Sequence, residues 1–142
     1  METEMNLENI ILGQSINNPE LIDEIAQYVP NGDVFVQARA RRLWEIIISR
    51  QKDGKRVDNM SIASCLSAYD NEHGIDAVYV VDCTTSATFQ GSAIDELTHA
   101  KLMYEKYLLR KVINYSKGIE SLASNNSGNV YEAIEKAHKN LG

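Results

Sequence analysis

The feature that most constrains the fold of this chain is a long amphipathic pattern in its second half. Between residues 92 and 124 there is no proline, and Gly118 is the single glycine. A continuous helix over these positions would contain about 33 residues and reach roughly 50 Å at about 1.5 Å per residue. The chain has 142 residues, which is enough for one compact domain, and such a domain does not need a helix of that length. We therefore expect a long helix that projects from a small helical core.

Apolar side chains run along this predicted helix in two neighbouring stripes. At about 100° per residue, the first stripe contains Ile94, Leu97, Tyr104, Leu108, Val112, Tyr115, Ile119 and Leu122. The second stripe contains Leu102, Leu109 and Ile113. One packed helix covers one seam, so a face of this width needs a second partner or leaves apolar surface in water at a cost.

The residues that follow supply one of the two partners. Asn125-Asn126-Ser127-Gly128 is a turn sequence, and the apolar residues after it have helical spacing: Val130, Ala133, Ile134, Ala137 and Leu141. Residues 92–142 are therefore predicted to form an antiparallel helical hairpin that leads to a linker. The uncovered part of the long helix is predicted to be a self-association interface, formed by Leu97, Tyr104, Leu108, Val112, Tyr115, Leu102, Leu109 and Ile113.

The first half of the remaining chain contains two short helical patterns. A first helix is predicted over Leu7–Ile16, and Asn18-Pro19-Glu20 is typical of the start of a second helix, with a capping side chain before the proline. Pro30-Asn31-Gly32 ends that helix. Val34-Phe35-Val36 is expected to be extended.

The next helical patterns are those of residues 40–92. A third helix has its apolar face formed by Leu43, Trp44, Ile47 and Ile48, and Asp53-Gly54 stops it. Asp58 is predicted to cap a fourth helix, whose inward residues would be Ile62, Cys65, Leu66 and Tyr69. Residues 74–83 are predicted to be helical although their valines suit a strand, because there is no second strand to pair with. Residues 84–92 are predicted to be a polar loop.

These patterns predict an all-α fold. It consists of a small helical head over residues 1–91 and a C-terminal antiparallel helical hairpin over residues 92–142. The two parts are expected to form a single structural domain.

The net charge of −6 is unevenly distributed along the chain. Residues 1–38 and residues 57–96 each contain seven acids and no Lys or Arg, whereas residues 39–56 carry a net +5 and residues 97–142 a net +3. Opposite potentials steer association, so the basic segment is a candidate partner-binding patch. The alternative is a solvated helix face that contacts nothing. The patch is predicted at Arg39, Arg41, Arg42 and Arg50.

Nucleic-acid binding by the basic segment 39–56 is a further alternative, because bases contact phosphates and an aromatic ring can stack on a nucleobase. Trp44, however, shares a face with Leu43 and Ile47, which favours burial over stacking. The acidic net charge of the whole chain also disfavours direct DNA binding.

Catalytic machinery is not evident in the sequence. The three histidines are far apart, and neighbouring acids such as Asp95-Glu96 point about 100° apart on a helix. Cys65 and Cys83 lack further ligands for zinc, which needs about four, and are predicted to be small buried side chains. A Gly-x-x-x-x-Gly-Lys-Ser/Thr phosphate-binding loop is absent. We expect no catalytic site, no metal and no cofactor.

The sequence also bears on the compartment of the protein. Its acidic N-terminus is followed by no long apolar run, so it does not resemble a secretory signal. No apolar segment reaches the roughly 20 residues that span a bilayer. We expect a cytoplasmic protein without a membrane partner.

Five segments of the chain, in this order and at compatible spacing, resemble one known family. They are Leu7–Gly13, Asn18–Glu24, Phe35 with Arg42–Ile47, Gly54–Asp58 with Ile62 and Leu66, and Glu105–Ile113. Over residues 6–141 the chain resembles the N-terminal domain of the DnaB family of hexameric replicative helicases. Glu105–Ile113 is the closest match, and it resembles the Glu-Lys and Leu-Leu-Arg core of the long hairpin helix of the family.

The chain departs from the family pattern in two places. Val34-Phe35-Val36 stands where the family usually has Asp-Phe-Tyr, and Ala40 stands where it usually has His. These departures indicate a divergent member, such as a phage-borne one, and neither removes a catalytic group.

The resemblance implies a role in DNA replication without catalysis. In the family, hairpins pair between subunits, dimers build a ring collar, and the collar docks primase or a helicase loader. ATP and magnesium belong to a P-loop ATPase domain that follows in the family. Two alternatives remain open: a stand-alone regulator that caps or inhibits a helicase or its loader, and a nucleic-acid-binding module that uses residues 39–56.

Overall fold

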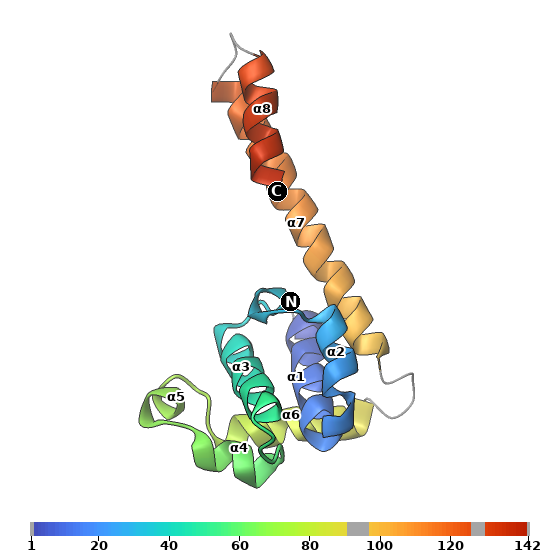
Figure 1. The fold of residues 1–142 in the computed structure, drawn as a ribbon, viewed down its shortest axis with the longest axis vertical. Coiled ribbons are helices and arrows are strands. Elements are labelled where there is room, and N and C mark those ends of the chain that lie inside the picture. Colours follow the sequence, from blue (N-terminus) through green and yellow to red (C-terminus); the bar gives the residue numbers. More distant parts are fainter. Residues whose placement is uncertain (1, 91–96, 126–129, 142) are drawn as a thin grey trace. The chain divides into compact units, whose positions relative to one another are not determined.

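The computed structural model describes residues 2–90, 97–125 and 130–141, and the regular elements in these ranges are all helices (Figure 1). The predicted all-α class is confirmed. The chain divides into two compact units, a head unit of residues 1–104 and a hairpin unit of residues 105–142. The predicted boundary between residues 91 and 92 falls outside the described residues. Among the described helices, none is long and apolar enough to cross a membrane.

The described residues of the head unit form six α-helices, two short 3-10 turns and the first residues of a seventh helix. In chain order these are α1 (Glu2–Asn17), η1 (Pro19–Leu21), α2 (Ile22–Tyr28), η2 (Gly32–Val34), α3 (Ala38–Lys52), α4 (Asn59–Cys65), α5 (Ala68–Glu72), α6 (Ala77–Gln90) and the start of α7 (Thr98–Asn125). The predicted helices at the start, around Trp44 and after Asp58 are confirmed. So is the helical state of most of residues 74–83.

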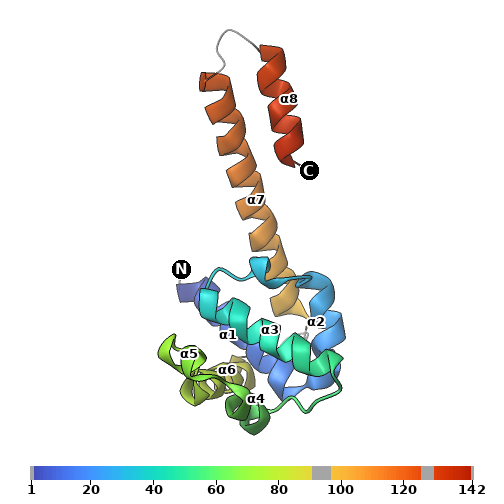
Figure 2. The same cartoon turned by 60° about the vertical axis from the view of Figure 1, so that its left-hand side comes forward.

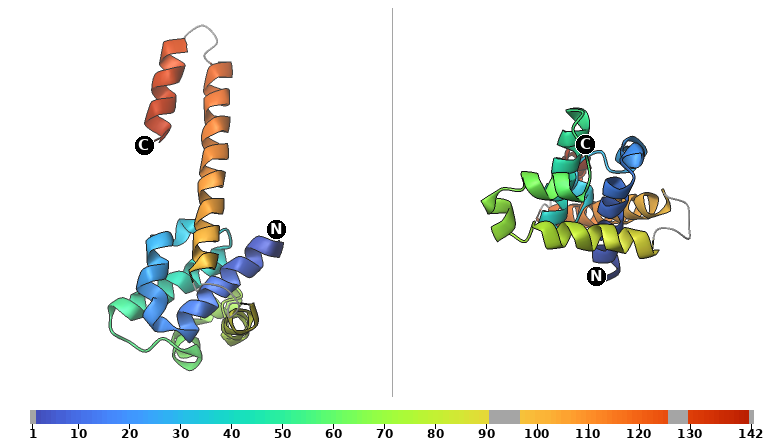
Figure 3. Two further views of the ribbon diagram at one scale, coloured as in Figure 1. Left: turned by 90° about the vertical axis from the view of Figure 1, so that its right-hand side faces the viewer. Right: turned by 90° about the horizontal axis from the view of Figure 1, so that it is seen from below.

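The centre of the head unit is the crossing of α1 and α6 (Figure 3). Gly13 lies at this crossing, where an added Cβ would overlap the backbone carbonyl of Cys83. The two helix backbones can therefore approach closely only because position 13 has no side chain. Apolar side chains with almost no exposed surface surround the crossing, among them Ile11, Leu12, Ile22, Ile25, Phe35, Leu43, Ile47, Ile62 and Val80.

The start of helix α3 is capped by the carboxylate of a residue in a different helix. Its N-cap residue, Gln37, makes no capping side-chain hydrogen bond. Instead the buried Glu8 of α1 accepts hydrogen bonds from the backbone N–H groups of Val36, at 2.7 Å, and Gln37, at 3.2 Å. A negative charge at this position also suits the positive end of the helix dipole. Glu8 therefore ties the start of α3 to α1.

Two local predictions for the head unit are wrong. Val34-Phe35-Val36 is not extended throughout: Val34 ends the η2 turn, and Phe35 that follows has an extended backbone. Residues 84–90 are not a loop but the second half of α6. The hydroxyl groups of Thr84 and Thr88 donate to backbone carbonyls one turn earlier, so these polar side chains are accommodated within the helix.

The region after Asp58 also differs from the prediction. Asp58 caps α4 by accepting from the backbone N–H of Ser61 at 2.7 Å, as expected. The helix ends at Cys65, however, and the separate helix α5 begins at Ala68, so Cys65 and Tyr69 are exposed rather than buried. At the second helix start, the Asn18 side chain makes no capping hydrogen bond and a 3-10 turn precedes α2.

The hairpin unit consists of α7 from Glu105 onward and of α8 (Val130–Leu141), which runs back alongside it (Figure 2). The predicted return helix is confirmed at both ends. The described part of α7 begins at Thr98, and the predicted start near residue 92 lies outside the described residues. Of the side chains described in this unit, only Ala137 is buried.

Candidate protein-interaction surfaces

Apolar side chains cover much of the surface of the hairpin unit. On α7, the exposed fraction of Leu108, Leu109, Val112 and Ile113 lies between 41% and 62%. On α8, Tyr131 and Ile134 are also exposed. Such a continuous apolar surface is typical of a contact with another molecule. It includes four of the eight residues predicted to form the self-association interface.

A groove runs between the two helices of the hairpin unit, with a volume of about 640 Å³. We call it the α7–α8 groove. Its lining is mostly apolar and includes two small residues, one on each helix. The lining residues are Leu108, Lys111, Val112, Asn114, Tyr115, Gly118, Ile119 and Ala137.

Of the other four residues of the predicted interface, Tyr115 lines the α7–α8 groove and three belong to the head unit. Leu97 and Tyr104 are half-buried, and Leu102 is exposed. The Tyr104 ring packs edge-on against the ring of Tyr28, with the centroids 6.4 Å apart. Tyr104 therefore stabilises the head unit, and of the three only Leu102 counts as exposed, at 42%.

The four arginines of the predicted partner patch each contact their own chain. The Arg39 guanidinium lies over the ring of Tyr79, 4.2 Å from its centroid. The Arg41 Nε donates to the carbonyl of Phe35 at 2.9 Å. The positive charges of these two side chains therefore help to fix the position of α3 within the head unit.

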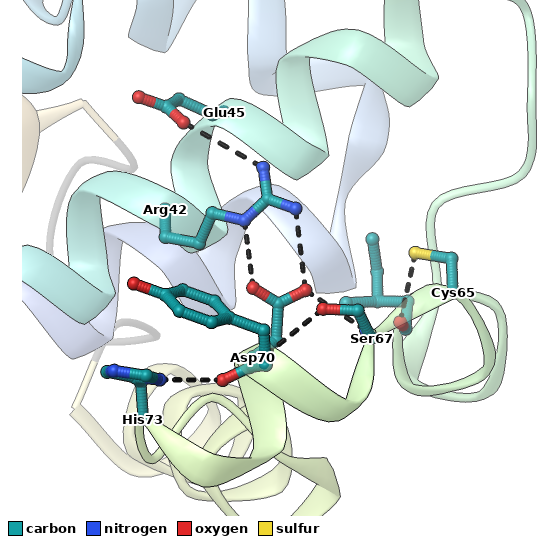
Figure 4. A network of polar contacts seen from close by, with 8 residues as sticks. Arg42, Glu45, Cys65, Ser67, Asp70 and His73 are labelled. Carbon is teal, nitrogen blue, oxygen red and sulfur yellow. Dashed lines mark hydrogen bonds and ion pairs between the residues drawn. The ribbon is translucent and has the colours of Figure 1, made fainter.

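Arg42 makes the most extensive of these contacts, with Asp70 of α5 (Figure 4). Its Nε and Nη2 donate to the two carboxylate oxygens at 3.0 and 3.4 Å. Asp70 is buried and also completes a capping box with Ser67 at the start of α5. Hydrogen bonds from Arg42, and then from the Ser67 backbone, lower the pKa of Asp70 to about 2. The pair attaches the five-residue helix α5 to α3.

Several basic side chains of residues 39–56 face solvent, both on α3, where Arg41 and Arg42 are exposed, and in the turn after it. Lys52 and Lys55 are exposed. Arg50 donates to the carbonyl of Arg56 at 2.8 Å, and Arg56 pairs with Asp58 at 3.0 Å. A shallow depression of about 870 Å³ adjoins them, lined by Arg50, Arg56, Asp58, Asn59, Met60, Ser61, Ser64 and Cys65. The accessible basic charge of residues 39–56 thus extends from Arg41 to Arg56 and includes residues of the predicted patch.

Comparison with known protein families identifies the family of this chain. The family model described as the DnaB-like helicase N-terminal domain matches residues 1–98, more than half of the chain. The chain belongs to this family. The family is the non-catalytic N-terminal part of DnaB-like helicases.

A solved structure extends the comparison over both units. The crystal structure of the N-terminal domain of DnaB helicase from Mycobacterium tuberculosis is similar to this chain with a TM-score of 0.75 and 16% sequence identity. The similarity covers 95% of this chain and 94% of the other. At this identity it concerns the fold alone, and it includes the hairpin helices that the family model does not reach. No curated protein matches the chain.

Three titratable side chains of this DnaB-like domain lie in different surroundings. His73 stacks on the exposed ring of Tyr69, with its Nδ1 2.8 Å from the Tyr69 carbonyl oxygen. His99 is buried, and desolvation lowers its pKa. Burial raises the pKa of the Cys83 thiol to about 12, which leaves it a neutral core group as predicted. The described residues contain no group of three potential metal ligands.

One exposed apolar face of α6 in this DnaB-like domain was not predicted from the sequence. Val78, Val81 and Phe89 are exposed, and 80% of the Phe89 side chain is accessible. They are spaced for one side of a helix. The spacing was visible in the sequence, but assigning residues 84–92 to a loop separated Phe89 from the valines.

Proposed function

We propose that this chain is the assembly and docking domain of a DnaB-type replicative helicase, and that its hairpin unit makes the contact between subunits. The main support for the proposal is that Ala137 is the only buried side chain among the described residues of the hairpin unit. Two helices with so little buried apolar surface gain little from packing on each other, because most helix stability in proteins comes from burying an apolar face.

The apolar residues of the hairpin unit are therefore better explained by a contact with another molecule. Leu109 and Ile113 lie four positions apart on one face of α7, and both are more than half exposed, at 62% and 53%. Burying a Leu or Ile side chain stabilises an assembly by about 1.5–3 kcal/mol. A second hairpin unit offers the same surface in return, as a two-fold contact between identical chains requires.

The docking part of the proposal concerns primase or a helicase loader. The solvent-facing cations after α3 support it, because exposed charge at the rim of a contact sets the association rate and partner choice. We propose no cofactor for this domain, and ATP and magnesium would be bound by an ATPase domain of the helicase. Direct DNA binding is less well supported, because Trp44 is buried and three of the predicted arginines, at positions 39, 41 and 42, are held by the head unit.

Self-association can be tested with a pair of matched double variants. Leu109→Asp with Ile113→Asp places two charges on the apolar face, whereas Ser121→Asp with Ser124→Asp places the same two charges at exposed polar positions of α7. Sedimentation equilibrium should show the unaltered chain and the serine variant rising above the 15.9 kDa monomer mass with concentration. The Leu109 and Ile113 variant should remain a monomer with unchanged helicity. Equal association of both variants would refute the assignment of this face.

A further inference from the structure

The shallow depression beside the end of α3, which we call the α3–α4 depression, is lined by two arginines and an exposed methionine. Arg50 comes from the last turn of α3, Arg56 from the segment after it and Met60 from α4. The Met60 side chain is 81% exposed. Methionine is common in surfaces that bind other proteins, because its flexible side chain adapts to the partner. One surface thus offers two cations and an apolar contact.

The two arginines are held in place within the chain. The Arg50 Nε donates to the carbonyl of Arg56 at 2.8 Å, and the Arg56 Nε lies 3.0 Å from a carboxylate oxygen of Asp58. Asp58 is fixed in turn, because it caps α4 by accepting from the backbone N–H of Ser61. Each guanidinium has two further nitrogens that can donate to a partner. Cations that are already positioned lose less conformational freedom when a partner binds, which favours binding.

The charge of the α3–α4 depression indicates a negatively charged partner. Residues 50–65 contain four bases and two acids, in a chain with a net charge of −6. Asp58 is the one acid among the described lining residues. The exposed Lys55 adds to the positive charge, because its backbone N–H donates to the carbonyl of Arg50 at 2.9 Å and so places it next to this arginine. Opposite potentials favour association, so acidic groups suit this surface.

A protein segment suits the α3–α4 depression better than a nucleic acid. None of the described lining residues is aromatic, so a base has no ring on which to stack. The Asp58 carboxylate repels a phosphate group at this site, whereas carboxylates spaced along a peptide can lie on either side of it. The exposed Met60 adds an apolar contact that a peptide side chain can cover and a phosphate backbone cannot.

We propose that the α3–α4 depression binds an acidic segment of a partner protein, with carboxylates of the segment on Arg50 and Arg56 and an apolar side chain on Met60. The proposal rests on the docking part of the proposed function and gives the docking a place and a partner chemistry. Carboxylates and guanidinium groups form charge-assisted hydrogen bonds. The apolar contact is not screened by salt, so binding is weakened at high salt but is not abolished.

The test titrates the full 142-residue chain with a short capped peptide that has glutamates on both sides of two leucines. Backbone amide signals of Asn59–Cys65 in NMR spectra should shift with a dissociation constant on the order of 1 mM or below. Arg50→Gln with Arg56→Gln should raise this constant about fivefold or more. Lys117→Gln with Lys139→Gln removes the same charge from exposed positions of the hairpin unit and should leave it within about twofold. Equal weakening by both pairs would refute the site.

A second comparison tests the apolar contact. Met60→Ser should weaken binding of the leucine peptide about threefold or more, and should not affect a peptide in which serines replace the two leucines. Unchanged signals outside residues 50–65 show that each variant is folded. Absence of any shift with the leucine peptide up to about 10 mM overturns the proposal. Tighter binding of oligothymidylate at the same signals would also overturn it, in favour of a nucleic acid.

Binding of the cognate primase or loader separates this site from the proposed function. If neither protein binds the unaltered chain, the docking function itself fails. If one of them binds, and the variant with Arg50→Gln and Arg56→Gln binds it equally well, the docking function holds and the α3–α4 depression alone is refuted.

Discussion

The head unit and the hairpin unit differ in how much of their apolar surface is buried. In the head unit, α1, α2, α3 and α6 contribute side chains with almost no exposed surface, and buried polar groups such as Glu8 and Asp70 have hydrogen-bond partners inside the unit. In the hairpin unit, the apolar side chains of α7 face solvent and only Ala137 is buried among those described. The head unit buries its own apolar side chains, as a stable independent fold does. The hairpin unit leaves apolar side chains exposed, as a surface that contacts another molecule does.

The largest expected difference between the two units is the loss of stability when a leucine side chain is shortened to alanine. Leu43→Ala removes a fully buried side chain from the head unit and should lower the free energy of unfolding by about 2–5 kcal/mol. Leu109→Ala, at an exposed position of the hairpin unit, should change the stability of the monomer by less than about 0.5 kcal/mol. Urea unfolding at low protein concentration measures both. A large loss for Leu109→Ala in the monomer would show that the hairpin unit has a core of its own.

The two helical glycines give the next largest difference. Gly13→Ala forces α1 away from α6 and should destabilise the head unit by about 3 kcal/mol. Gly118→Ala should instead stabilise the monomer by about 0.5–1 kcal/mol, because alanine favours the helix and its Cβ meets nothing. Thermal unfolding of the two variants compares them directly. The same sign of change for both would contradict the difference between the units.

The Arg42–Asp70 pair adds a pH-dependent contribution to the head unit alone. Asp70→Asn should lower the free energy of unfolding by about 1–2 kcal/mol, because Arg42 loses its charged partner and a neutral amide has only one oxygen that can accept. The pKa of Asp70 is lowered from 3.8 to about 2, so the folded state favours the ionised form. The contribution is therefore complete above about pH 4 and is lost as the pH falls through about 2.

Urea midpoints of the unaltered chain and of Asp70→Asn, measured between pH 6 and pH 2, provide the test. The difference between the two proteins should be constant down to about pH 4 and shrink below it. A difference that stays the same throughout this range would mean that the Asp70 charge does not contribute.

The smallest expected effect on stability concerns the exposed cations after α3. Lys52→Glu with Lys55→Glu should change the free energy of unfolding by less than about 0.5 kcal/mol, since both side chains are exposed. Binding of the cognate primase or loader should be weakened, more at low than at high salt. Arg42→Glu offers the contrast, because it places two carboxylates together and should destabilise the head unit. Unchanged partner binding by the lysine variant would leave these lysines as a solvated surface only.

Much of the helical fold could be predicted from particular residues. The spacing of Leu43, Trp44 and Ile47 indicated α3, and the Asn125–Gly128 turn sequence separated α7 from α8. The end of α6 could not be predicted in this way, because Thr84 and Thr88 have side chains that are common in loops. Their place in a helix depends on α6 packing across α1 at Gly13, which is a contact between residues about 70 positions apart.

The candidate interaction surfaces could likewise be predicted only in part. The apolar positions of α7 were visible as two stripes, but their exposure depends on how much of them α8 covers. The arginines of residues 39–56 were visible as a block of charge, but the sequence did not indicate that Arg42 meets Asp70 28 residues later or that Arg41 meets the carbonyl of Phe35.

The sequence by itself determined that this protein is helical, that it contains one long amphipathic helix with more apolar surface than one partner helix covers, and that it resembles the DnaB family. These properties follow from local spacing, which fixes the face of a helix on which each side chain lies. Only the tertiary structure decided which charges are paired and which apolar face stays exposed. It also decided that a Cβ at Gly13 would overlap another helix, whereas a Cβ at Gly118 would meet no other atom. The reason is physical: burial and pairing depend on groups that approach through space, and their positions are set by the packing of distant segments.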